Sequence, residues 1–235
     1  MSKTTPDLEK NGFVVVPTFY SKEQLAMIRA SAREGLFRVE GAMRSEQVYA
    51  VRRALQVMPQ LVTSVFSQAF RDLVCSILSK GAFITKSIWF EKPAGGNWFV
   101  GWHQDISISV KRRVDAPGYS RWTAKHGVIG VVPPLPILER TLTIRIHLDD
   151  ADGDNGDVRV IAASHRSGIQ PPPVFGTEGQ VCCVPAGGVM LMRPLLLHAS
   201  SRSVTSRPRR VLHVELNDME LTGGVEWAER LTLDL

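Results

Sequence analysis

The chain has 235 residues, a mean hydropathy of -0.02 and 44% hydrophobic residues, which is typical of a globular protein with a complete core. It contains no uninterrupted run of the roughly 18 apolar residues that a membrane helix needs, and the polar opening MSKTTPDLEKNG lacks the apolar core of a signal peptide. The net charge of +5 is spread along the chain, so it permits an anionic substrate and does not indicate a nucleic-acid partner. The cysteines have no metal-ligand spacing, and we expect a cytoplasmic protein with no membrane partner, built as a single domain over residues 1–235.

Helices are predicted in the first third of the chain, over about residues 21–80. A short strand, FVVVP at 13–17, precedes them. Ser21 and Gln24 form a capping box that begins the first helix. A second helix is predicted over 59–79, because its apolar residues recur at helical spacing: Val62, Phe66, Phe70, Leu73 and Ile77.

The pattern from residue 82 to about 217 is typical of strands. Segments of β-type composition are separated by clusters of Gly, Pro, Asn and Asp: FITKSIWFEK, WHQDISISV, TLTIRIHLDD, VRVIAAS, QVCCVPAGGVMLM, LLLHAS and RRVLHVELN. Serial short strands of this kind predict a sandwich or a barrel. The segment 111–140 is an exception, because it is long, rich in proline and without a clear pattern. It predicts either a lid over a functional site or a disordered loop.

A candidate metal-binding pair lies in GWHQDISISV, at residues 101–110. His103 and Asp105 are two residues apart, and in an extended strand such residues point to the same side. Two histidines and one carboxylate leave open positions on a ferrous ion, so a third ligand is expected from a later strand; His198 in PLLLHASS suits this role. A second pair, His147 and Asp149, precedes the acidic run DADGDNGD, which is typical of a solvated hairpin. A pair of this kind alone is either a metal site or a buried histidine near a surface aspartate.

An arginine after His198 adds a second requirement of the same chemistry. Arg209 begins the alternating strand RRVLHVELN, and a guanidinium can bind a carboxylate with two hydrogen bonds. An iron oxygenase that uses 2-oxoglutarate must hold the far carboxylate of this cosubstrate. Alternation places Arg209 and Arg210 on opposite faces, and Ser200 on the same side as His198. The alternative is a basic strand on the surface.

Taken in order, these motifs resemble the phytanoyl-CoA dioxygenase (PhyH)-like family of Fe(II)/2-oxoglutarate-dependent oxygenases. The similarity extends over about 10–217 and rests on KNGFVVVPTFYSKEQL, WHQD, HLDDADGDNGDVRVIAASHRSG, PAGGVMLMRPLLLHASS and the position of Arg209. AASH at 162–165 departs from the PGSH of the family, which affects a turn and a structural histidine, His165.

The resemblance implies a mainly β fold with flanking helices, a double-stranded β-helix that forms a jelly-roll, cupin-like barrel. It implies Fe(II) bound by His103, Asp105 and His198, with His147 off the metal, and 2-oxoglutarate and O2 as cosubstrates. It also implies that Lys92 assists Arg209 and Ser200 in binding 2-oxoglutarate; the alternative is that Lys92 only ends an edge strand. Related halogenases lack the carboxylate ligand, so Asp105 predicts hydroxylation, while desaturation and ring formation stay open.

Several residues are candidates for contacts with the substrate. Arg145 lies in mid-strand between apolar positions, so we expect it to meet either a substrate anion or an internal acid, Glu91 or Glu215. The other candidates are Lys86, which shares a strand face with Lys92; Trp102, the best placed of three tryptophans with Trp98 and Trp122; and Lys125 with His126 in the lid-like segment. His213 is expected to be structural.

Three functions remain in play. The first is hydroxylation of a small, anionic or zwitterionic metabolite, with succinate and CO2 as coproducts. The second is demethylation or hydroxylation of a nucleic acid or protein, which requires a continuous basic groove with aromatic residues. The third is a non-catalytic cupin-like binding protein, which would bind no iron and release no succinate. The sequence does not determine the oligomeric state.

Overall fold

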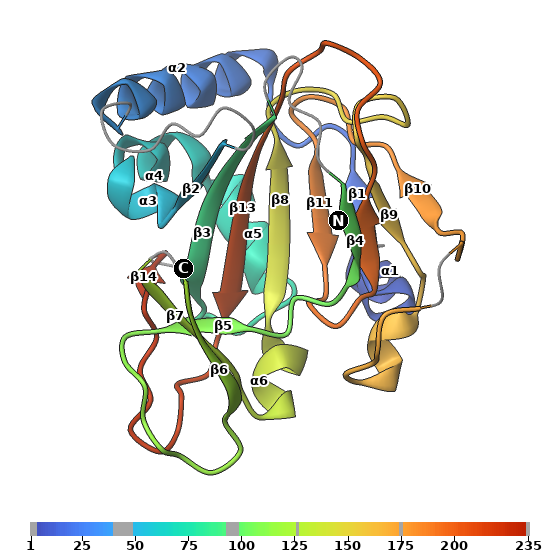
Figure 1. The fold of residues 1–235 in the computed structure, drawn as a ribbon. Coiled ribbons are helices and arrows are strands. Elements are labelled where there is room, and N and C mark those ends of the chain that lie inside the picture. The colour runs from blue at the N-terminus through green and yellow to red at the C-terminus, as the bar shows by residue number, and fades with distance from the viewer. Residues whose placement is uncertain (1–3, 40–48, 93–98, 126, 174–175, 234–235) are drawn as a thin grey trace.

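The described strands form three antiparallel β-sheets, two at the centre of the molecule and a third at the lower edge of the view in Figure 1. The computed structural model describes residues 4–39, 49–92, 99–125, 127–173 and 176–233. A seven-stranded major sheet has the order β1-β11-β8-β13-β3-β14, with β2 paired to β3. A four-stranded minor sheet, β10-β9-β12-β4, packs against it, and a three-stranded small sheet, β5-β7-β6, adjoins them. This arrangement is the predicted jelly-roll barrel.

The strands lie mostly where the alternating segments predict them. The major sheet contains β1 (Phe13–Val16), β2 (Tyr49–Arg52), β3 (Phe83–Lys92), β8 (Leu142–His147), β11 (Val189–Met192), β13 (Arg209–Asn217) and β14 (Leu231–Thr232). The minor sheet contains β4 (Val100–His103), β9 (Val158–Val160), β10 (Gln180–Cys182) and β12 (His198–Ser200). The small sheet contains β5 (Ile108–Val110), β6 (Ser120–Lys125) and β7 (Val128–Val132).

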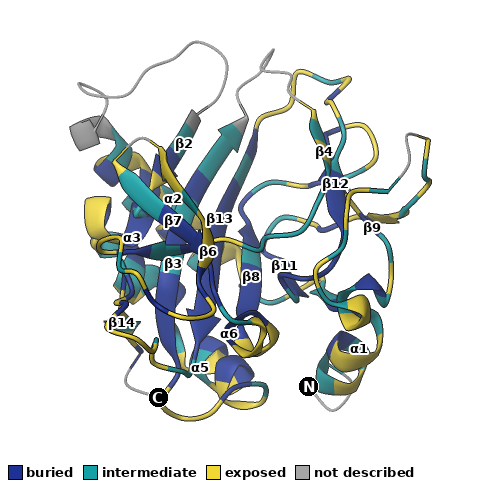
Figure 2. Cartoon of the chain, turned by 60° about the horizontal axis from the view of Figure 1, so that its bottom comes forward, coloured by how far each residue is buried: buried dark blue, intermediate teal, exposed yellow. Residues whose placement is uncertain are grey.

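The described helices are α1 (Thr4–Asn11), α2 (Lys22–Val39), α3 (Ala54–Val57), α4 (Gln60–Val65), α5 (Gln68–Cys75) and α6 (Leu135–Arg140), with a 3-10 helix at Ser164–Ser167. Helix α6 packs in the apolar cluster of the small sheet, whereas the other α-helices pack with the major sheet. Helices α2 to α5 bury their apolar sides against that sheet in the largest hydrophobic cluster, and burial is greatest along its strands (Figure 2). None of the described helices is both long and apolar enough to cross a lipid bilayer.

The strands of the major sheet divide their side chains between this helical layer and the barrel interior, the space facing the minor sheet. On β8, Ile144 and Ile146 pack toward the helices, whereas Arg145 and His147 face the interior. On β13, the interior side is occupied by four residues: Arg209, Val211, His213 and Glu215. Polar interior positions on two adjacent central strands are unusual for a simple core, so they indicate a functional interior.

The prediction of one continuous helix over 59–79 is wrong, because the segment forms two helices. Phe66 and Ser67 leave helical geometry, with ψ of 63° and 167°, and the segment divides into α4 and α5. The Ser67 side chain accepts a hydrogen bond from the Phe70 backbone N–H at 3.4 Å and caps α5. The apolar stripe survives this break because both short helices pack on the same sheet. Elements α1, β2 and α3 were not predicted.

Two other expectations need correction. The segment WHQDISISV is not one strand, because β4 ends at His103 and β5 begins at Ile108. The segment 111–140 is not irregular, since it contains β6, β7 and α6. Its prolines hid this order: they stand outside the two strands, where they leave the ladder hydrogen bonds intact. The small sheet that results packs an apolar core of its own around Ile108 and Val131.

The capping box predicted at the start of α2 is present. The Gln24 backbone N–H donates to Ser21 Oγ at 3.2 Å, and the Ser21 N–H donates to Gln24 Oε1 at 2.9 Å. Substitution Ser21→Ala is expected to lower the free energy of unfolding by about 1 kcal/mol, because it leaves an N-terminal N–H of α2 without its cap. Urea denaturation measures this change. Lys22→Ala, at an exposed neighbour, is the control and should change stability by less than about 0.5 kcal/mol.

Candidate metal and cosubstrate site

Two histidines are brought face to face by adjacent strands of the minor sheet. His103 on β4 lies directly opposite His198 on β12, and the ring centroids are 4.1 Å apart. Each Nδ1 donates to a backbone carbonyl, that of Gly101 at 2.8 Å and that of Leu196 at 2.9 Å. Because a carbonyl can only accept, Nδ1 carries the proton and Nε2 of each ring is available as a ligand atom.

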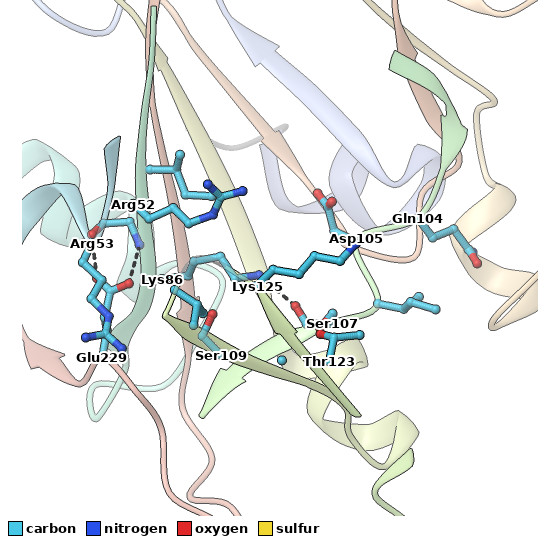
Figure 3. Close-up of a pocket in the computed structure, with 15 residues that line it drawn as sticks. Arg52, Arg53, Lys86, Gln104, Asp105, Ser107, Ser109, Thr123, Lys125 and Glu229 are labelled. Carbon is cyan, nitrogen blue, oxygen red and sulfur yellow. Dashed lines mark hydrogen bonds between the residues drawn. The ribbon is translucent and has the colours of Figure 1, made fainter. Parts of the chain in front are cut away.

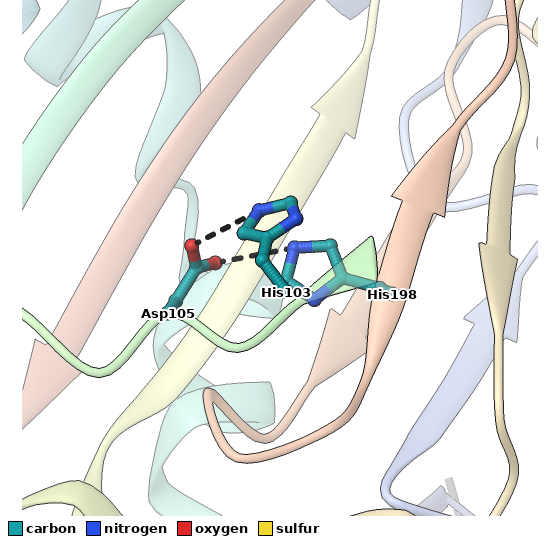
Figure 4. Close-up of side chains that lie close together, drawn as sticks. All are labelled: His103, Asp105 and His198. Atoms are coloured by element: carbon teal, nitrogen blue, oxygen red, sulfur yellow. Dashed lines mark ion pairs between the residues drawn. The ribbon is translucent and has the colours of Figure 1, made fainter. Parts of the chain in front are cut away.

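Asp105 completes a three-residue cluster (Figure 4). Its Oδ1 lies 3.7 Å from His103 Nε2, and its Oδ2 lies 3.5 Å from His198 Nε2. The predicted pairing of His103 with Asp105 assumed one continuous strand, but β4 ends at His103. Asp105 lies beyond it, where its backbone N–H donates to the Pro194 carbonyl at 2.8 Å. All three ligand atoms lie within 4.8 Å of one another. Two imidazole nitrogens and one carboxylate on one side of an open space fit a ferrous ion.

The charge states of this cluster also fit metal binding. Burial lowers the pKa of His198 to about 4, although the nearby Asp105 carboxylate opposes the shift. Burial alone would raise the pKa of Asp105, but attraction to His198, His213 and His103 outweighs burial and holds it below its usual range. At pH 7 the site therefore offers a neutral imidazole at His198 and an ionised carboxylate, the forms in which these groups coordinate metal.

Arg209 and Ser200 lie together on the interior side of the barrel. Both side chains donate to the Gly156 carbonyl, Ser200 Oγ at 3.1 Å and Arg209 through Nη1. Arg209 is only 5% exposed, and burial followed by repulsion from Arg145 lowers its pKa to about 10. It therefore remains a cation at pH 7. Lys92 is the β3 residue paired with Arg209 in the ladder.

Arg210 occupies the opposite face, as alternation predicts. Its Nε and Nη2 each lie 2.7 Å from an Asp149 carboxylate oxygen, which makes a bidentate pair outside the barrel. The second histidine–aspartate pair of the sequence is thus divided. Asp149 serves this ion pair, and His147 faces the interior with both ring nitrogens buried and without a hydrogen-bond partner among the described residues.

Arg145 does not form the predicted ion pair with Glu91 or Glu215. Its Nη1 lies 3.4 Å from His213 Nδ1, and its Nε has no hydrogen-bond partner among the described residues. Glu215 instead accepts from Lys86 Nζ at 2.8 Å, and His213 Nε2 lies 3.3 Å from the same carboxylate oxygen. Asp105, His213 and Glu215 also group their ligand atoms within 4.8 Å, but Lys86 already supplies that second cluster with a cation.

A cavity of about 330 Å³ opens beside Asp105 (Figure 3). Four cationic side chains line it, namely Arg52, Arg53, Lys86 and Lys125, together with two acids, Asp105 and Glu229. Lys86 also donates to the Ser107 carbonyl at 2.8 Å, and Lys125 points toward Asp105 from the small sheet. The predicted lid segment thus contributes one wall of the cavity.

The sequence patterns did not indicate three of these charged lining residues, Arg52, Arg53 and Glu229. Arg52 ends β2, a strand too short to be recognised, and its position opposite Ile88 places it on the interior side of the major sheet. Arg53 adopts the left-handed region with φ of 53° and ψ of 44°, a costly conformation for a residue other than glycine. Strain of this kind often accompanies a functional site, but it is visible only in the structure and not in the residue types.

The tryptophans are placed differently from the expectation. Trp102 points to the side of β4 opposite to that of His103. Its indole ring packs so closely on Gly179 that a Cβ added at this glycine would be 2.3 Å from the ring. Trp122 packs with the core of the small sheet, 5.8 Å below the Arg113 guanidinium. Trp98 and His126 lie outside the described residues. His165, expected to be structural, places its Nε2 3.2 Å from the Glu9 carbonyl.

A jelly-roll barrel that gathers two histidines and an aspartate beside a buried arginine defines the class of non-haem iron oxygenases that use 2-oxoglutarate. The model of the phytanoyl-CoA dioxygenase (PhyH) family matches residues 8–211, and the chain belongs to this family. Membership of this family, together with the fold and the site, makes the protein an Fe(II)- and 2-oxoglutarate-dependent enzyme. No curated protein matches the chain significantly.

Solved structures share the fold at low sequence identity. The non-heme monooxygenase ThoJ in its apo form is 17% identical with a TM-score of 0.70, covering 96% of this chain and 80% of its own. EctD from S. alaskensis, with 2-oxoglutarate and 5-hydroxyectoine, is 17% identical with a TM-score of 0.69, covering 92% and 76%. The α-ketoglutarate-dependent epimerase SnoN from nogalamycin biosynthesis is 16% identical with a TM-score of 0.67, covering 92% and 80%.

Proposed function

We propose that the protein hydroxylates a C–H bond of a small anionic or zwitterionic metabolite. The balanced reaction consumes O2 and 2-oxoglutarate and yields the alcohol, succinate and CO2. The observation that carries this proposal is the cavity that four cationic side chains line together with Asp105, a residue of the candidate metal centre. Its volume of about 330 Å³ lies at the lower end of the range for small-molecule sites.

The proposed roles of the residues follow from their positions. His103, Asp105 and His198 would hold the iron, which when bound supplies activation of O2 coupled to oxidative decarboxylation of 2-oxoglutarate. Arg209 and Ser200 would bind the far carboxylate of 2-oxoglutarate, and Lys92, on the neighbouring strand β3, would assist this binding. Asp105 fills the ligand position that a halide needs, which favours hydroxylation over halogenation.

The charges of the cavity favour an anion as substrate. Lys86 is already neutralised by Glu215, so its charge is internally balanced. Glu229 accepts two hydrogen bonds from Ser87, at 3.2 Å and 2.6 Å. Of the cationic residues that line the cavity, Arg52, Arg53 and Lys125 have no carboxylate within ion-pair distance among the described residues, whereas Lys86 has Glu215. Arg52 and Lys125 are exposed, so a bound anion could pair with them without breaking an existing ion pair.

A substrate screen tests the proposal. The purified protein with Fe(II), ascorbate and 2-oxoglutarate is assayed for succinate in the presence of carboxylated, phosphorylated, zwitterionic, neutral and cationic metabolites, and of an oligonucleotide and a peptide. We expect stimulation by an anionic or zwitterionic metabolite, with a hydroxylated product detected by mass spectrometry. Stimulation by neutral compounds alone, or by a macromolecule alone, would show that the proposed substrate class is wrong.

Arg52→Gln is expected to raise the KM for such a substrate by about 10- to 100-fold, since a charge-assisted hydrogen bond contributes about 1.5–3 kcal/mol. The 2-oxoglutarate concentration for half-maximal turnover should stay unchanged, because Arg52 lines the cavity proposed for the substrate. Steady-state kinetics with each component varied in turn measures both effects. Arg207→Gln, which removes a surface ion pair with Asp152, is the matched control. An unchanged KM in Arg52→Gln would exclude this arginine as the anion contact.

A further inference from the structure

The interior face of β8 presents two polar residues that the proposed roles do not use, Arg145 and His147. In the ladder with β13, Arg145 is paired with His213 and His147 with Val211. Arg209 comes two residues before Val211 on the same side of β13, so it is a diagonal neighbour of His147. His147 therefore lies between two guanidiniums, those of Arg145 and Arg209.

This group contains buried hydrogen-bonding atoms that no described residue satisfies. They are Arg145 Nε and both ring nitrogens of His147, which is 0% exposed. Burial, followed by repulsion from Arg145 and Arg209, holds the pKa of His147 well below its usual value, so the ring is neutral and carries one N–H. The unsatisfied groups thus include two N–H donors, and a buried donor without an acceptor is costly. The missing component is an acceptor.

The charges point in the same direction. Burial lowers the pKa of Arg145, and the Asp105 carboxylate opposes this shift, yet Arg145 has no carboxylate in ion-pair distance among the described residues. Asp157, the acid that interacts with Arg209, is paired with Arg159 Nε at 3.8 Å. Two neighbouring guanidiniums that repel each other inside a barrel are stabilised by an anion placed between them.

The place of Arg145 indicates which anion this is. Arg145 lies 3.4 Å from His213, whose ring is within 4.8 Å of Asp105, and His147 comes next on the same side of β8, toward Arg209. Arg145 and His147 thus lie along the interior between Asp105 and Arg209. It is not among the residues that line the cavity beside Asp105, whereas Lys86 and Lys125 are. A dicarboxylate held by both the candidate metal centre and Arg209 would therefore lie beside Arg145, whereas a substrate confined to that cavity would not.

We propose that Arg145 and His147, together with Arg209, bind the far carboxylate of 2-oxoglutarate, so that two guanidiniums and a neutral imidazole hold it. This inference rests on the proposed cosubstrate role of Arg209. It assigns Arg145 to the cosubstrate and not to the substrate. It also makes the site selective for dicarboxylate over monocarboxylate 2-oxo acids, because a ligand without the second carboxylate leaves both cations unpaired.

Binding measured without turnover tests the assignment. Isothermal titration calorimetry on the Mn(II)-loaded protein compares 2-oxoglutarate with 2-oxopentanoate, which has the same chain without the far carboxylate. Arg145→Gln should weaken 2-oxoglutarate binding by about 10- to 100-fold and leave 2-oxopentanoate binding within about twofold. Arg145→Lys keeps the charge but loses the Nε donor, and should fall between the two. His147→Gln, which retains one N–H donor, should weaken 2-oxoglutarate binding by less than about tenfold.

Other outcomes would overturn the inference in distinguishable ways. Equal weakening of both ligands in Arg145→Gln would mean a structural role, and unchanged 2-oxoglutarate affinity would mean that Arg145 serves the substrate or neither ligand. Arg210→Gln, on the outer face of the same sheet, is the control and should leave both affinities unchanged. Failure of the unaltered protein to bind 2-oxoglutarate would instead contradict the proposed role of Arg209. Circular dichroism of each variant confirms folding.

Discussion

His198→Ala is expected to bind Fe(II) more than about 100-fold less tightly than the unaltered protein and to release succinate only at background level. The substitution removes the Nε2 that lies 3.5 Å from the Asp105 carboxylate, the ring nitrogen left available because Nδ1 donates to the Leu196 carbonyl. His103 and Asp105 would remain as a two-residue set, which leaves the metal with too few protein ligands. Fe(II) titration and the succinate assay measure the two effects separately.

A histidine outside the cluster provides the control for this variant. His165→Gln preserves a side-chain donor near the Glu9 carbonyl and should retain Fe(II) binding and turnover. Alanine at position 198 buries less polar surface than histidine, so we expect the variant to fold. Thermal melting measures this. A folded His198→Ala protein with full activity would mean that the three-residue cluster is not the metal centre.

Arg209→Ala is expected to raise the 2-oxoglutarate concentration for half-maximal turnover by about 100-fold. A buried guanidinium that binds a carboxylate contributes about 1.5–3 kcal/mol or more, and Arg209 is 5% exposed within the barrel. Turnover at saturating 2-oxoglutarate should fall much less, because the metal ligands stay in place. Succinate release measured against 2-oxoglutarate concentration distinguishes these two parameters.

Arg210→Ala is the matched control, because it removes the next guanidinium on the same strand. Arg210 binds Asp149 on the outer face, so its loss should affect stability and not the 2-oxoglutarate requirement. If both variants raise the requirement equally, the effect arises from damage to β13 and the cosubstrate role of Arg209 is excluded.

Much of the fold follows from local sequence patterns. The alternation that predicts β8 and β13 is strong because each strand has one apolar side packed on helices and one polar side facing the interior. The same alternation placed Arg209 and Arg210 on opposite faces. His103, Asp105 and His198 were grouped because few combinations of residue types suit a ferrous ion, and the structure brings them together even though Asp105 lies outside the strand.

The cavity beside Asp105 was much harder to predict, since its walls come from segments distant in sequence. Arg52, Lys125 and Glu229 meet only because the major and small sheets pack together. The interior partners of Arg145 were also unpredictable. Glu215 was a reasonable candidate, but it forms an ion pair with Lys86 on the neighbouring strand β3. For Trp102, proximity in sequence to a ligand was misleading, because neighbouring residues of a strand point to opposite sides.

The division of the site between two sheets has a mechanical consequence. The histidines belong to the minor sheet, whereas Arg145 and Arg209 belong to the major sheet. A cosubstrate held by both sets of residues, as proposed, would act as a noncovalent cross-link between the two layers of the barrel. It adds a stabilisation of about 2.7 kcal/mol when its concentration is about 100 times its Kd. Differential scanning calorimetry should therefore record a rising melting temperature as 2-oxoglutarate is added to the metal-loaded protein, and a smaller rise with a ligand that reaches only one layer.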